Sequence, residues 1–406
     1  MDIELNNDQL ECCFLLESWF NREEKQIFSI SGAGGTGKTT VIKFFIEQLG
    51  LDYDEVLFMT YMGKAANRLA QEGLPAKTIH STIYMVQRGY KRDENGKLVL
   101  DEDDKPVLIN GFVKKEYLDP RIKLIVLDEA SMIGRSIAED IISYGIPIIA
   151  LGDLNQLPPV MDNIYFLQKP DYVLHQIMRQ EEGNPIITLS QMVLHNQELR
   201  PSSLVSKDGK FMSHIIEKKD LNNAIIDSAD IILTCTQNDR FAFNNFIRRS
   251  ILGLDDLNKL YVGETLICRK NNWQLEGPLG NYLTNGMSGY VNEIRAINKR
   301  KKDCYKIDFK PDFLKKCFKG IYIDKTRLFA TPEELANNPN FKYENMKHTT
   351  KNQFEFGYAI TVHLSQGSQW DNVVLILNDW AKHSSIYKEI VYTGITRAVN
   401  SVTVVV

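Results

Sequence analysis

The chain has 406 residues, of which 43% are hydrophobic and 25% are charged, and its formal net charge is −4. This length exceeds one ordinary hydrophobic core and predicts two or more domains. The nearly balanced charge excludes nucleic-acid binding through bulk charge alone, so such binding would need local basic patches.

The cysteines and the first residues of the sequence bear on its compartment. The 6 cysteines form no C-x-x-C pair, and no His lies near one at zinc spacing, which favours reduced thiols. Met1–Leu5 is acidic and lacks an apolar signal core, and no apolar run approaches membrane-spanning length. We therefore expect a cytoplasmic protein that makes no membrane contact.

A glycine-rich loop lies between a predicted strand at Gln26–Ile30 and a predicted helix that starts at Thr40–Ile46. Gly32–Thr39 matches the phosphate-binding pattern G-x-x-x-x-G-K-[S/T] at every fixed position. In this pattern the backbone N–H groups and the helix N-terminus cradle phosphates, Lys38 reaches the β- and γ-phosphates, and Thr39 binds Mg²⁺. The residues predicted to bind the nucleotide here are Gly32, Gly34, Gly35, Thr36, Gly37, Lys38, Thr39 and Thr40.

Short apolar runs along the chain predict strands of covered parallel sheets. They are Val56–Met59, Leu124–Leu127 and Ile146–Leu151, then Ile231–Thr234, Val373–Leu377 and Val402–Val406. Predicted helices such as Gly63–Gln71 and Arg240–Ser250 lie between them. This alternation predicts a doubly wound α/β fold with two similar lobes, of which the first carries the phosphate loop.

Two segments depart from this alternation. Residues 90–108 are polar and contain Asn95-Gly96, a strong hairpin signal, with a second turn candidate at Asp103-Asp104. This hairpin is either a solvated excursion or a projecting pin. Residues 269–354 contain short strand-like pieces such as Ser288–Ile294 and Cys304–Phe309, which predict a small inserted β-barrel.

Acidic and amide side chains follow two of the predicted strands. Asp128 and Glu129 come directly after Leu124–Leu127, where a strand-end Asp is the second Mg²⁺ anchor of P-loop NTPases. Glu129 is then placed to activate the attacking water. Gln156, within Gly152–Val160, can reach the γ-phosphate or that water. We therefore predict a nucleoside-triphosphate hydrolysis site.

These segments, in this order, resemble superfamily 1 helicases, and most closely superfamily 1B, the 5′-to-3′ branch with RecD-like, Pif1-like and phage Dda-like helicases. The similarity covers nearly the whole chain. Besides the phosphate loop, the matching segments are Asn6–Gln9, Thr60–Ala66, Thr78–Ser81, Asp128–Ser131, Gly152–Val160, Met178–Gln180, Tyr358–Ser368 and Val391–Ala398. Gln369 departs from the pattern, because many relatives carry an acidic residue there that helps hold the ribose.

The resemblance implies two RecA-like P-loop lobes, with a β-hairpin inserted in the first and a small SH3-like β-barrel in the second. The implied domains are lobe 1A at residues 1–190 with hairpin domain 1B at about 84–116, lobe 2A at 191–268 and 356–406, and barrel domain 2B at 269–355.

It also implies roles for individual residues. Gln9 would contact adenine, Gly367 would lie at the nucleotide, and Arg179 and Arg397 would reach the γ-phosphate as catalytic arginines beside Lys38, Glu129 and Gln156. DNA would be bound by Thr60, Lys64, Thr78, His80, Ser81, Thr361, His363 and Ser365. Trp273 or Tyr282 could stack on bases or pack inside the barrel, and the basic run at 299–302 is interpreted as a solvated turn.

The resulting hypothesis is an ATP- and Mg²⁺-dependent DNA helicase that translocates 5′-to-3′ on single-stranded DNA and separates duplex strands. The alternatives are an RNA helicase, a translocase that does not unwind, and a nucleotide-gated binding subunit with slow hydrolysis. Expected partners are single-stranded DNA, duplex junctions and a single-stranded-DNA-binding or replication/recombination protein. We expect a monomer in a bacterial or phage-infected cell.

Overall fold

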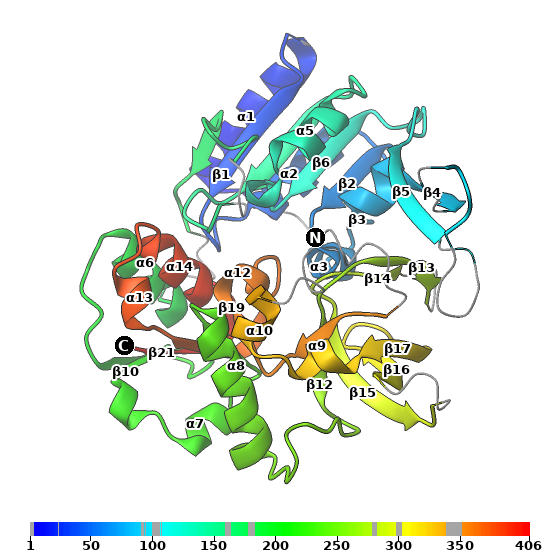
Figure 1. Cartoon of the computed structure of the whole chain (residues 1–406). Helices are drawn as coiled ribbons and strands as arrows, with labels where there is room; N and C mark the ends of the chain where they lie inside the picture. Colours follow the sequence, from blue (N-terminus) through cyan, green and yellow to red (C-terminus); the bar gives the residue numbers. More distant parts are fainter. Residues whose placement is uncertain are drawn as a thin grey trace. The chain divides into compact units, whose positions relative to one another are not determined.

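The computed structural model describes residues 4–406 except 23, 91–92, 94, 100–105, 107, 159–163, 178–182, 278–281, 298–302 and 338–350. The chain divides into two compact units (Figure 1). The first unit contains Met1–Ile83, Lys115–Cys235 and Thr361–Val406, and the second contains Tyr84–Lys114 and Thr236–Ile360.

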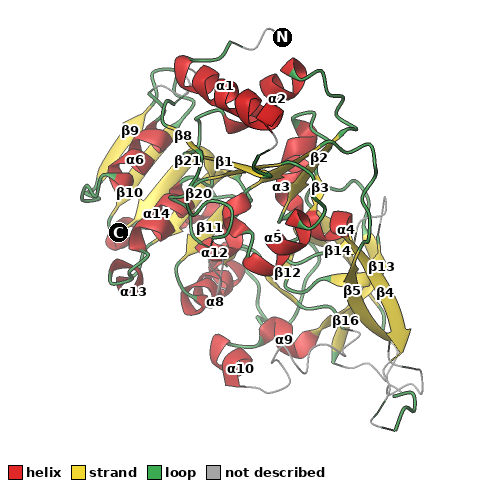
Figure 2. Cartoon of the chain, turned by 90° about the horizontal axis from the view of Figure 1, so that it is seen from above, coloured by secondary structure: helices red, strands yellow, loops and turns green. Residues whose placement is uncertain are grey.

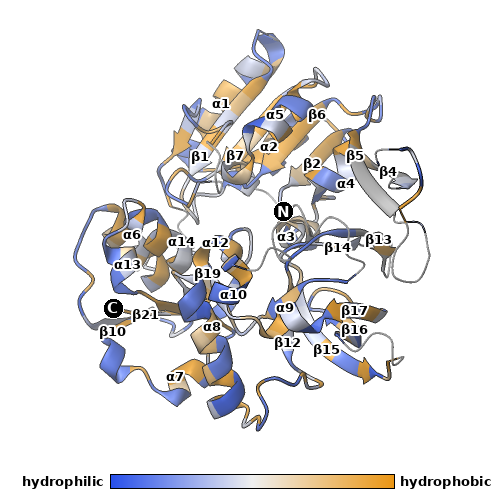
Figure 3. Ribbon diagram, in the orientation of Figure 1, coloured by the Kyte–Doolittle hydropathy of each residue, from blue (hydrophilic) through white to orange (hydrophobic). Residues whose placement is uncertain are grey.

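The first unit contains a parallel six-stranded sheet in the order β3-β2-β6-β7-β1-β8. Its strands are β1 (Ile27–Gly32), β2 (Val56–Thr60), β3 (Lys77–Thr78), β6 (Leu124–Asp128), β7 (Ile148–Gly152) and β8 (Tyr172–Leu174). Every residue of β6 and β7 is buried, as expected for a parallel sheet covered on both faces. These strands are correspondingly hydrophobic in Figure 3. Because all strands run the same way, the loops after β1, β6 and β7 meet at one edge.

Helices α1 and α2 pack on this sheet through one apolar stripe. In α1, Cys12, Leu16 and Trp19 recur at helical spacing and join one hydrophobic cluster with Phe45 of α2 and Phe58 of β2. The helices in this part of the chain are α1 (Asn7–Arg22), α2 (Lys38–Gln48), α3 (Gly63–Gln71), α4 (Ile79–Ile83), the 3₁₀ helix η1 (Ala130–Met132), α5 (Arg135–Ile142) and α6 (Pro185–Leu194).

A second six-stranded sheet has the order β19-β11-β20-β21-β10-β9. Strands β11, β20, β21 and β10 pair in parallel, and β9 pairs antiparallel with β10. The strands are β9 (Ser202–Val205), β10 (Met212–Ile216), β11 (Ile231–Thr234), β19 (Ala359–Thr361), β20 (Trp370–Ile376) and β21 (Ala398–Val405). The accompanying helices are η3 (Lys218–Asp220), α7 (Asn223–Asp227), α12 (Val362–Ser365), α13 (Asp379–Lys382) and α14 (Tyr387–Ile395). The predicted α/β class with parallel sheets is confirmed (Figure 2).

The second unit contains an antiparallel five-stranded sheet in the order β17-β16-β15-β12-β18. Its strands are β12 (Thr265–Cys268), β15 (Ser288–Arg295), β16 (Cys304–Pro311), β17 (Phe318–Asp324) and β18 (Phe354–Phe356). Strands β13 (Asn272–Glu276) and β14 (Tyr282–Leu283) form a separate pair. The helices are α8 (Gln237–Phe246), the π-helical η4 (Ile247–Ile251), α9 (Lys325–Phe329) and α10 (Pro332–Asn337). The predicted short strands are present, and the closed SH3-like barrel stays a prediction.

The predicted hairpin is an antiparallel pair of β4 (Tyr84–Tyr90) and β5 (Leu108–Lys114). Beyond β4, the Asp93 carboxylate accepts hydrogen bonds from the backbone N–H groups of Asn95 and Lys97, which forms a turn at the expected Asn95-Gly96 position. The second turn candidate, Asp103-Asp104, lies outside the described residues.

Several predicted boundaries differ from the structure, for example the terminal strand, which begins at Ala398 rather than Val402, and two of the differences have an identifiable local reason. Strand β7 begins at Ile148 rather than Ile146, after Pro147, which has no backbone N–H to donate to a sheet. Helix α8 begins earlier than predicted, because Thr236 caps it through the N–H of Asp239, and it changes to a π-helical turn at Ile247. The predicted four-part domain division stays a prediction.

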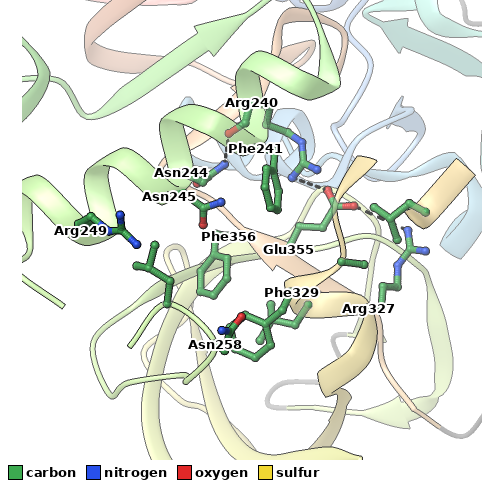
Figure 4. A pocket seen from close by; sticks show the side chains of 14 residues that line it. Arg240, Phe241, Asn244, Asn245, Arg249, Asn258, Arg327, Phe329, Glu355 and Phe356 are labelled. Carbon is green, nitrogen blue, oxygen red and sulfur yellow. Dashed lines mark hydrogen bonds and ion pairs between the residues drawn. The ribbon is translucent and has the colours of Figure 1, made fainter. Parts of the chain in front are cut away.

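One carboxylate organises the interior of the second unit. Glu355 on β18 pairs with Arg240 at 2.9 Å, Arg269 at 3.1 Å and Arg327 at 3.7 Å. Arg240 and Arg327 extend toward Glu355 at the wall of a cavity of about 270 Å³ that is also lined by phenylalanine rings such as Phe356 (Figure 4). Burial lowers the pKa of Arg240 and of Arg327, the Glu355 charge opposes this shift, and the Arg269 charge lowers both pKa values further.

Within the described ranges, no helix is long and apolar enough to span a bilayer.

Candidate functional site

The glycine-rich loop connects β1 to α2 in the first unit. Gly35 and Gly37 have φ values of 81° and 78°, in the left-handed region that favours glycine. A Cβ at Gly32 would lie 2.6 Å from the Thr36 hydroxyl oxygen. No side chain caps the N-terminus of α2, so its first N–H groups remain available to an anion.

The Lys38 ammonium lies back across this loop. Its Nζ donates to the carbonyl oxygen of Gly32 at 2.6 Å and approaches that of Ala33 at 3.3 Å. These contacts hold the charge at the mouth of the loop, where phosphate oxygens would replace the carbonyl oxygens.

Gln9 connects helix α1 to the loop. Its side chain and that of Asn6 form a reciprocal capping box, with bonds of 3.1 Å and 2.9 Å to each other's backbone N–H. The Gln9 Nε2 donates to the carbonyl oxygen of Thr36 at 3.0 Å, and the side chain is fully buried. Gln9 therefore shapes the loop, and its predicted adenine contact stays a prediction.

Asp128 ends β6 and is buried beside two cations. The Arg68 Nη2 on α3 lies 2.9 Å from the Asp128 Oδ2. Burial raises the pKa of Asp128, while the charges of Arg68 and Lys38 act in the opposite direction. Sequence analysis missed Arg68, because only the pairing of β2 with β6 brings α3 beside this carboxylate.

Glu129 adopts a strained backbone conformation at the start of η1. Its φ is 53° and its ψ is 42°, in the left-handed region, and only 8% of its surface is exposed. A non-glycine residue in this conformation costs on the order of 1–3 kcal/mol and persists only where the surroundings enforce it. The strain fixes the direction of Glu129 next to Asp128.

The loop after β7 is bonded to the C-terminal part of the first unit. The Tyr392 hydroxyl donates to the Asp153 Oδ2 at 2.6 Å, and the Leu157 N–H donates to the Thr393 Oγ1 at 2.9 Å. Gln366 Nε2 donates to the Leu157 carbonyl at 2.6 Å. These bonds fix the segment that carries Gln156, itself buried. Their partners lie more than 200 residues away in sequence, so no local pattern could have indicated them.

Arg397 is a buried cation with only neutral partners. Its guanidinium donates to the carbonyls of Thr393 at 3.1 Å and Ser368 at 3.3 Å, and to the Thr396 hydroxyl at 3.2 Å. Within the described part of the chain, no carboxylate forms an ion pair with it. Burial lowers its pKa, and the charge of Glu129 is the main opposing influence. Such a charge favours an additional anionic partner.

The residues predicted to bind DNA fall into two groups. Thr78 and Ser81 are accessible and hydrogen-bond to each other at the start of α4, whereas Thr60, Thr361 and Ser365 are buried. The Thr60 hydroxyl donates to the Met62 carbonyl at 2.7 Å, and the Ser365 hydroxyl to the Val362 carbonyl at 2.7 Å. The DNA contacts of all of these residues stay predictions.

His80 and His363 are half-buried, and burial lowers the pKa of each imidazole. Both rings are therefore neutral at pH 7, which suits stacking or hydrogen bonding rather than ion pairing with phosphate. His80 already contacts the Tyr61 ring edge-on, with centroids 5.9 Å apart.

The remaining predicted positions are either described without a nucleotide or DNA contact or lie outside the described residues. Gly367 has a φ of 70°, and a Cβ there would lie 3.2 Å from that of Met62, so it permits a close approach to the segment before α3. Its nucleotide contact stays a prediction. Arg179 and the basic run at 299–302 lie outside the described residues, as do the side chains of Lys64 and Trp273. Tyr282 is half-buried in β14.

Comparisons with known families match both ends of this arrangement. A model of the AAA domain matches residues 18–162, and a model of the UvrD-like helicase C-terminal domain matches residues 356–405. The first match contains the phosphate loop and Asp128-Glu129, and the second contains Arg397. The chain is 25% identical over 406 residues to the ATP-dependent RecD2 DNA helicase of Deinococcus radiodurans, covering 91% of this chain and 45% of that protein. These matches support the resemblance to superfamily 1B helicases.

Two further similarities are to a curated relative and to a solved structure. The chain is 32% identical over 145 residues to the ATP-dependent DNA helicase dda of Enterobacteria phage T4, covering 34% of this chain and 29% of that protein. The fold resembles a crystal structure of Bacteroides Pif1 bound to ssDNA, with a TM-score of 0.51, 17% identity, and coverage of 99% of this chain and 92% of that one. The chain spans less than half the length of these two curated relatives.

Proposed function

We propose that the protein is an ATP-dependent DNA helicase. The observation that carries this proposal is the arrangement within the first unit. The phosphate loop at the start of α2, the buried pair Asp128-Glu129 and the buried Arg397, which forms no ion pair with a described carboxylate, belong to one compact body. ATP hydrolysis needs these parts, namely phosphate binding, activation of water and positive charge on the γ-phosphate.

The residues present fit a magnesium ion. Thr39 supplies a hydroxyl oxygen and Asp128 a carboxylate oxygen, which are the hard ligands that Mg²⁺ prefers alongside phosphates and water. When bound, Mg²⁺ would neutralise charge on the β- and γ-phosphates.

The protein residues divide the remaining chemistry. Lys38 exchanges its carbonyl partners for phosphate oxygens, and Glu129 orients and deprotonates the attacking water with the help of Gln156. Arg397, with Arg179 as the second predicted finger, stabilises the transition state. An arginine finger contributes about 10³ to 10⁵ in rate.

The cycle of ATP binding and release would drive movement along DNA. The hydrogen bonds that connect the loop after β7 to Tyr392, Thr393 and Gln366 give hydrolysis a route to the C-terminal part of the unit. Repeated closing and opening then advances the protein along a strand. The family resemblance supports single-stranded DNA as the track, 5′-to-3′ polarity, and the β4–β5 hairpin as the element that separates strands.

DNA-stimulated hydrolysis tests this proposal. The rate of ATP hydrolysis is measured without nucleic acid, with single-stranded DNA and with single-stranded RNA, for the unchanged protein and for Lys38→Ala. We expect stimulation by DNA and loss of hydrolysis in Lys38→Ala. Preference for RNA would favour the RNA helicase. No stimulation by either nucleic acid would favour a nucleotide-gated subunit and refute the helicase.

A further inference from the structure

Arg68 and its two acidic neighbours form a cluster at the edge of the nucleotide site. Arg68 Nη2 bonds to Asp128 Oδ2 at 2.9 Å, while its Nε lies 3.9 Å from Glu72 Oε1, one turn further along α3. Neither an adenine, a phosphate nor a DNA contact has been assigned to Arg68, so this ion pair is not explained by the roles described above.

The two carboxylates compete unequally for the guanidinium. Asp128 has only 8% of its side chain exposed, so its charge needs the bonded Arg68 as a counter-ion. The Glu72 side chain is 42% exposed, so water already solvates its charge. The Arg68 Nε is buried without a hydrogen-bond partner. An unsatisfied buried donor is costly, and a small movement toward Glu72 would satisfy it. Arg68 therefore has a second acceptor available on its own helix.

A metal ion would compete with Arg68 for the same carboxylate. Asp128 is the predicted magnesium ligand, and a guanidinium bonded to one of its oxygens both occupies that oxygen and repels a divalent cation. A coordinated metal ion would supply Asp128 with a stronger counter-charge. The ion pair between Arg68 and Asp128 would then no longer be needed to neutralise the buried carboxylate.

We propose that Arg68 is an exchangeable counter-ion, which neutralises Asp128 before the magnesium–nucleotide complex binds and transfers to Glu72 when it does. This inference rests on the proposed nucleotide site and adds a positioning residue to it. Since α3 follows directly after Thr60–Met62, the exchange changes the ion pairs of the helix that leads from a predicted DNA-binding segment. Through this exchange, binding of the magnesium–nucleotide complex directly changes the electrostatic interactions of α3.

The test measures the Mg²⁺ dependence of ADP binding by calorimetry, over a series of Mg²⁺ concentrations and in EDTA. Arg68→Gln removes the competing cation, so we expect the apparent Mg²⁺ affinity to rise about 10-fold, the value of one charge-assisted hydrogen bond. Glu72→Gln removes the alternative acceptor and should lower the Mg²⁺ affinity. Arg68→Lys keeps the charge and should resemble the unchanged protein.

A matched control comes from helix α5, where Arg135 and Glu139 form an exposed pair of the same spacing. Arg135→Gln should leave Mg²⁺ affinity unchanged, and ADP binding in EDTA should be similar in every variant. Weaker Mg²⁺ binding in Arg68→Gln would mean that Arg68 orients Asp128 instead, and equal binding in all variants would mean that the ion pair is static. Either result would overturn this inference and leave the proposed nucleotide site intact. If the unchanged protein binds ADP without any Mg²⁺ dependence, both the inference and the proposed site fail.

Discussion

At the scale of single residues, the proposed nucleotide site contains two cations whose described hydrogen-bond partners are neutral oxygens. Lys38 is bonded to carbonyls of its own loop, and Arg397 is buried among two carbonyls and a hydroxyl. Both cations are held in place by neutral oxygens, which bind them less strongly than anions would. Each is therefore ready to exchange its neutral partners for phosphate oxygens.

Glu129→Gln should separate nucleotide binding from hydrolysis. The amide keeps the shape of the side chain but cannot accept a proton from water, so we expect ADP and ATP affinity to stay within about 3-fold while kcat falls about 10²- to 10⁴-fold. Single-turnover hydrolysis and equilibrium binding measure the two effects. Turnover near that of the unchanged protein would remove Glu129 from the role of base.

Arg397→Lys should lower kcat about 10³-fold or more, because a lysine cannot reproduce the planar array of donors at the γ-phosphate. The measurement is kcat together with the melting temperature. Glu198 and Arg200 form an exposed ion pair that is distant from Arg397 in the sequence. Arg200→Lys therefore serves as the control. An unchanged kcat in Arg397→Lys would exclude the finger.

At the scale of elements, distant segments of the first unit are connected by a few buried hydrogen bonds. Tyr392 in α14 and Asp153 after β7 form one of these, and burial together with the Asp153 charge raises the pKa of the Tyr392 hydroxyl well above its usual range. The hydroxyl is therefore a permanent donor at every physiological pH.

Tyr392→Phe should show what this connection contributes. Removing the hydroxyl takes away the Tyr392 donor to the buried Asp153 Oδ2, while Oδ1 keeps its hydrogen bonds from Asn155. Losing one donor to a buried carboxylate costs about 1–3 kcal/mol of unfolding free energy. Coupling between hydrolysis and movement should also weaken, seen as less DNA stimulation of ATP hydrolysis. Tyr117 is 76% exposed, so Tyr117→Phe is the control and should change neither quantity. If the two variants behave alike, the bond between Tyr392 and Asp153 has no role in stability or coupling.

In the second unit, Glu355→Gln should be strongly destabilising. Three guanidiniums would then face one another without a counter-charge, and breaking a buried ion pair in this way costs about 3–5 kcal/mol. Urea denaturation monitors the loss, and the exposed Glu198→Gln is the control. A loss of unfolding free energy below about 1 kcal/mol would indicate that solvent already screens the charges of the three arginines.

The sequence predicted those features that depend on local pattern. Helix Gly63–Gln71 is confirmed at both ends, and the phosphate loop lies between a strand and a helix as its motif requires. The Arg68–Asp128 pair could not be predicted, because it depends on strand pairing between distant segments, and no residue type in the sequence signals the left-handed φ of Glu129. The same holds for Glu355, whose three partners come from α8, α9 and the residue after β12.

At the scale of the whole molecule, one chain carries matches to an AAA domain and to a UvrD-like helicase C-terminal domain. The AAA-domain match and the UvrD-like match lie at opposite ends of the sequence, and the hairpin and the antiparallel sheet belong to the second compact unit. Under the proposed function, one set of residues would hydrolyse ATP and another would act on DNA.

Replacing residues 91–107 by a short turn should therefore lose strand separation while keeping DNA-stimulated hydrolysis. The β4–β5 pair provides the two ends that such a turn would join. Unwinding of a forked duplex and ATP hydrolysis are measured on the same preparation. If unwinding survives, the hairpin is a surface excursion. If hydrolysis is lost as well, it has a structural role.

The most direct test of the central claim is unwinding of duplexes that carry a single-stranded overhang at either the 5′ or the 3′ end, with ATP and Mg²⁺. We predict strand separation from the 5′ overhang alone and none with Lys38→Ala. Separation from the 3′ overhang would contradict the proposed polarity, and failure on both substrates despite DNA-stimulated hydrolysis would contradict the helicase itself and leave a translocase.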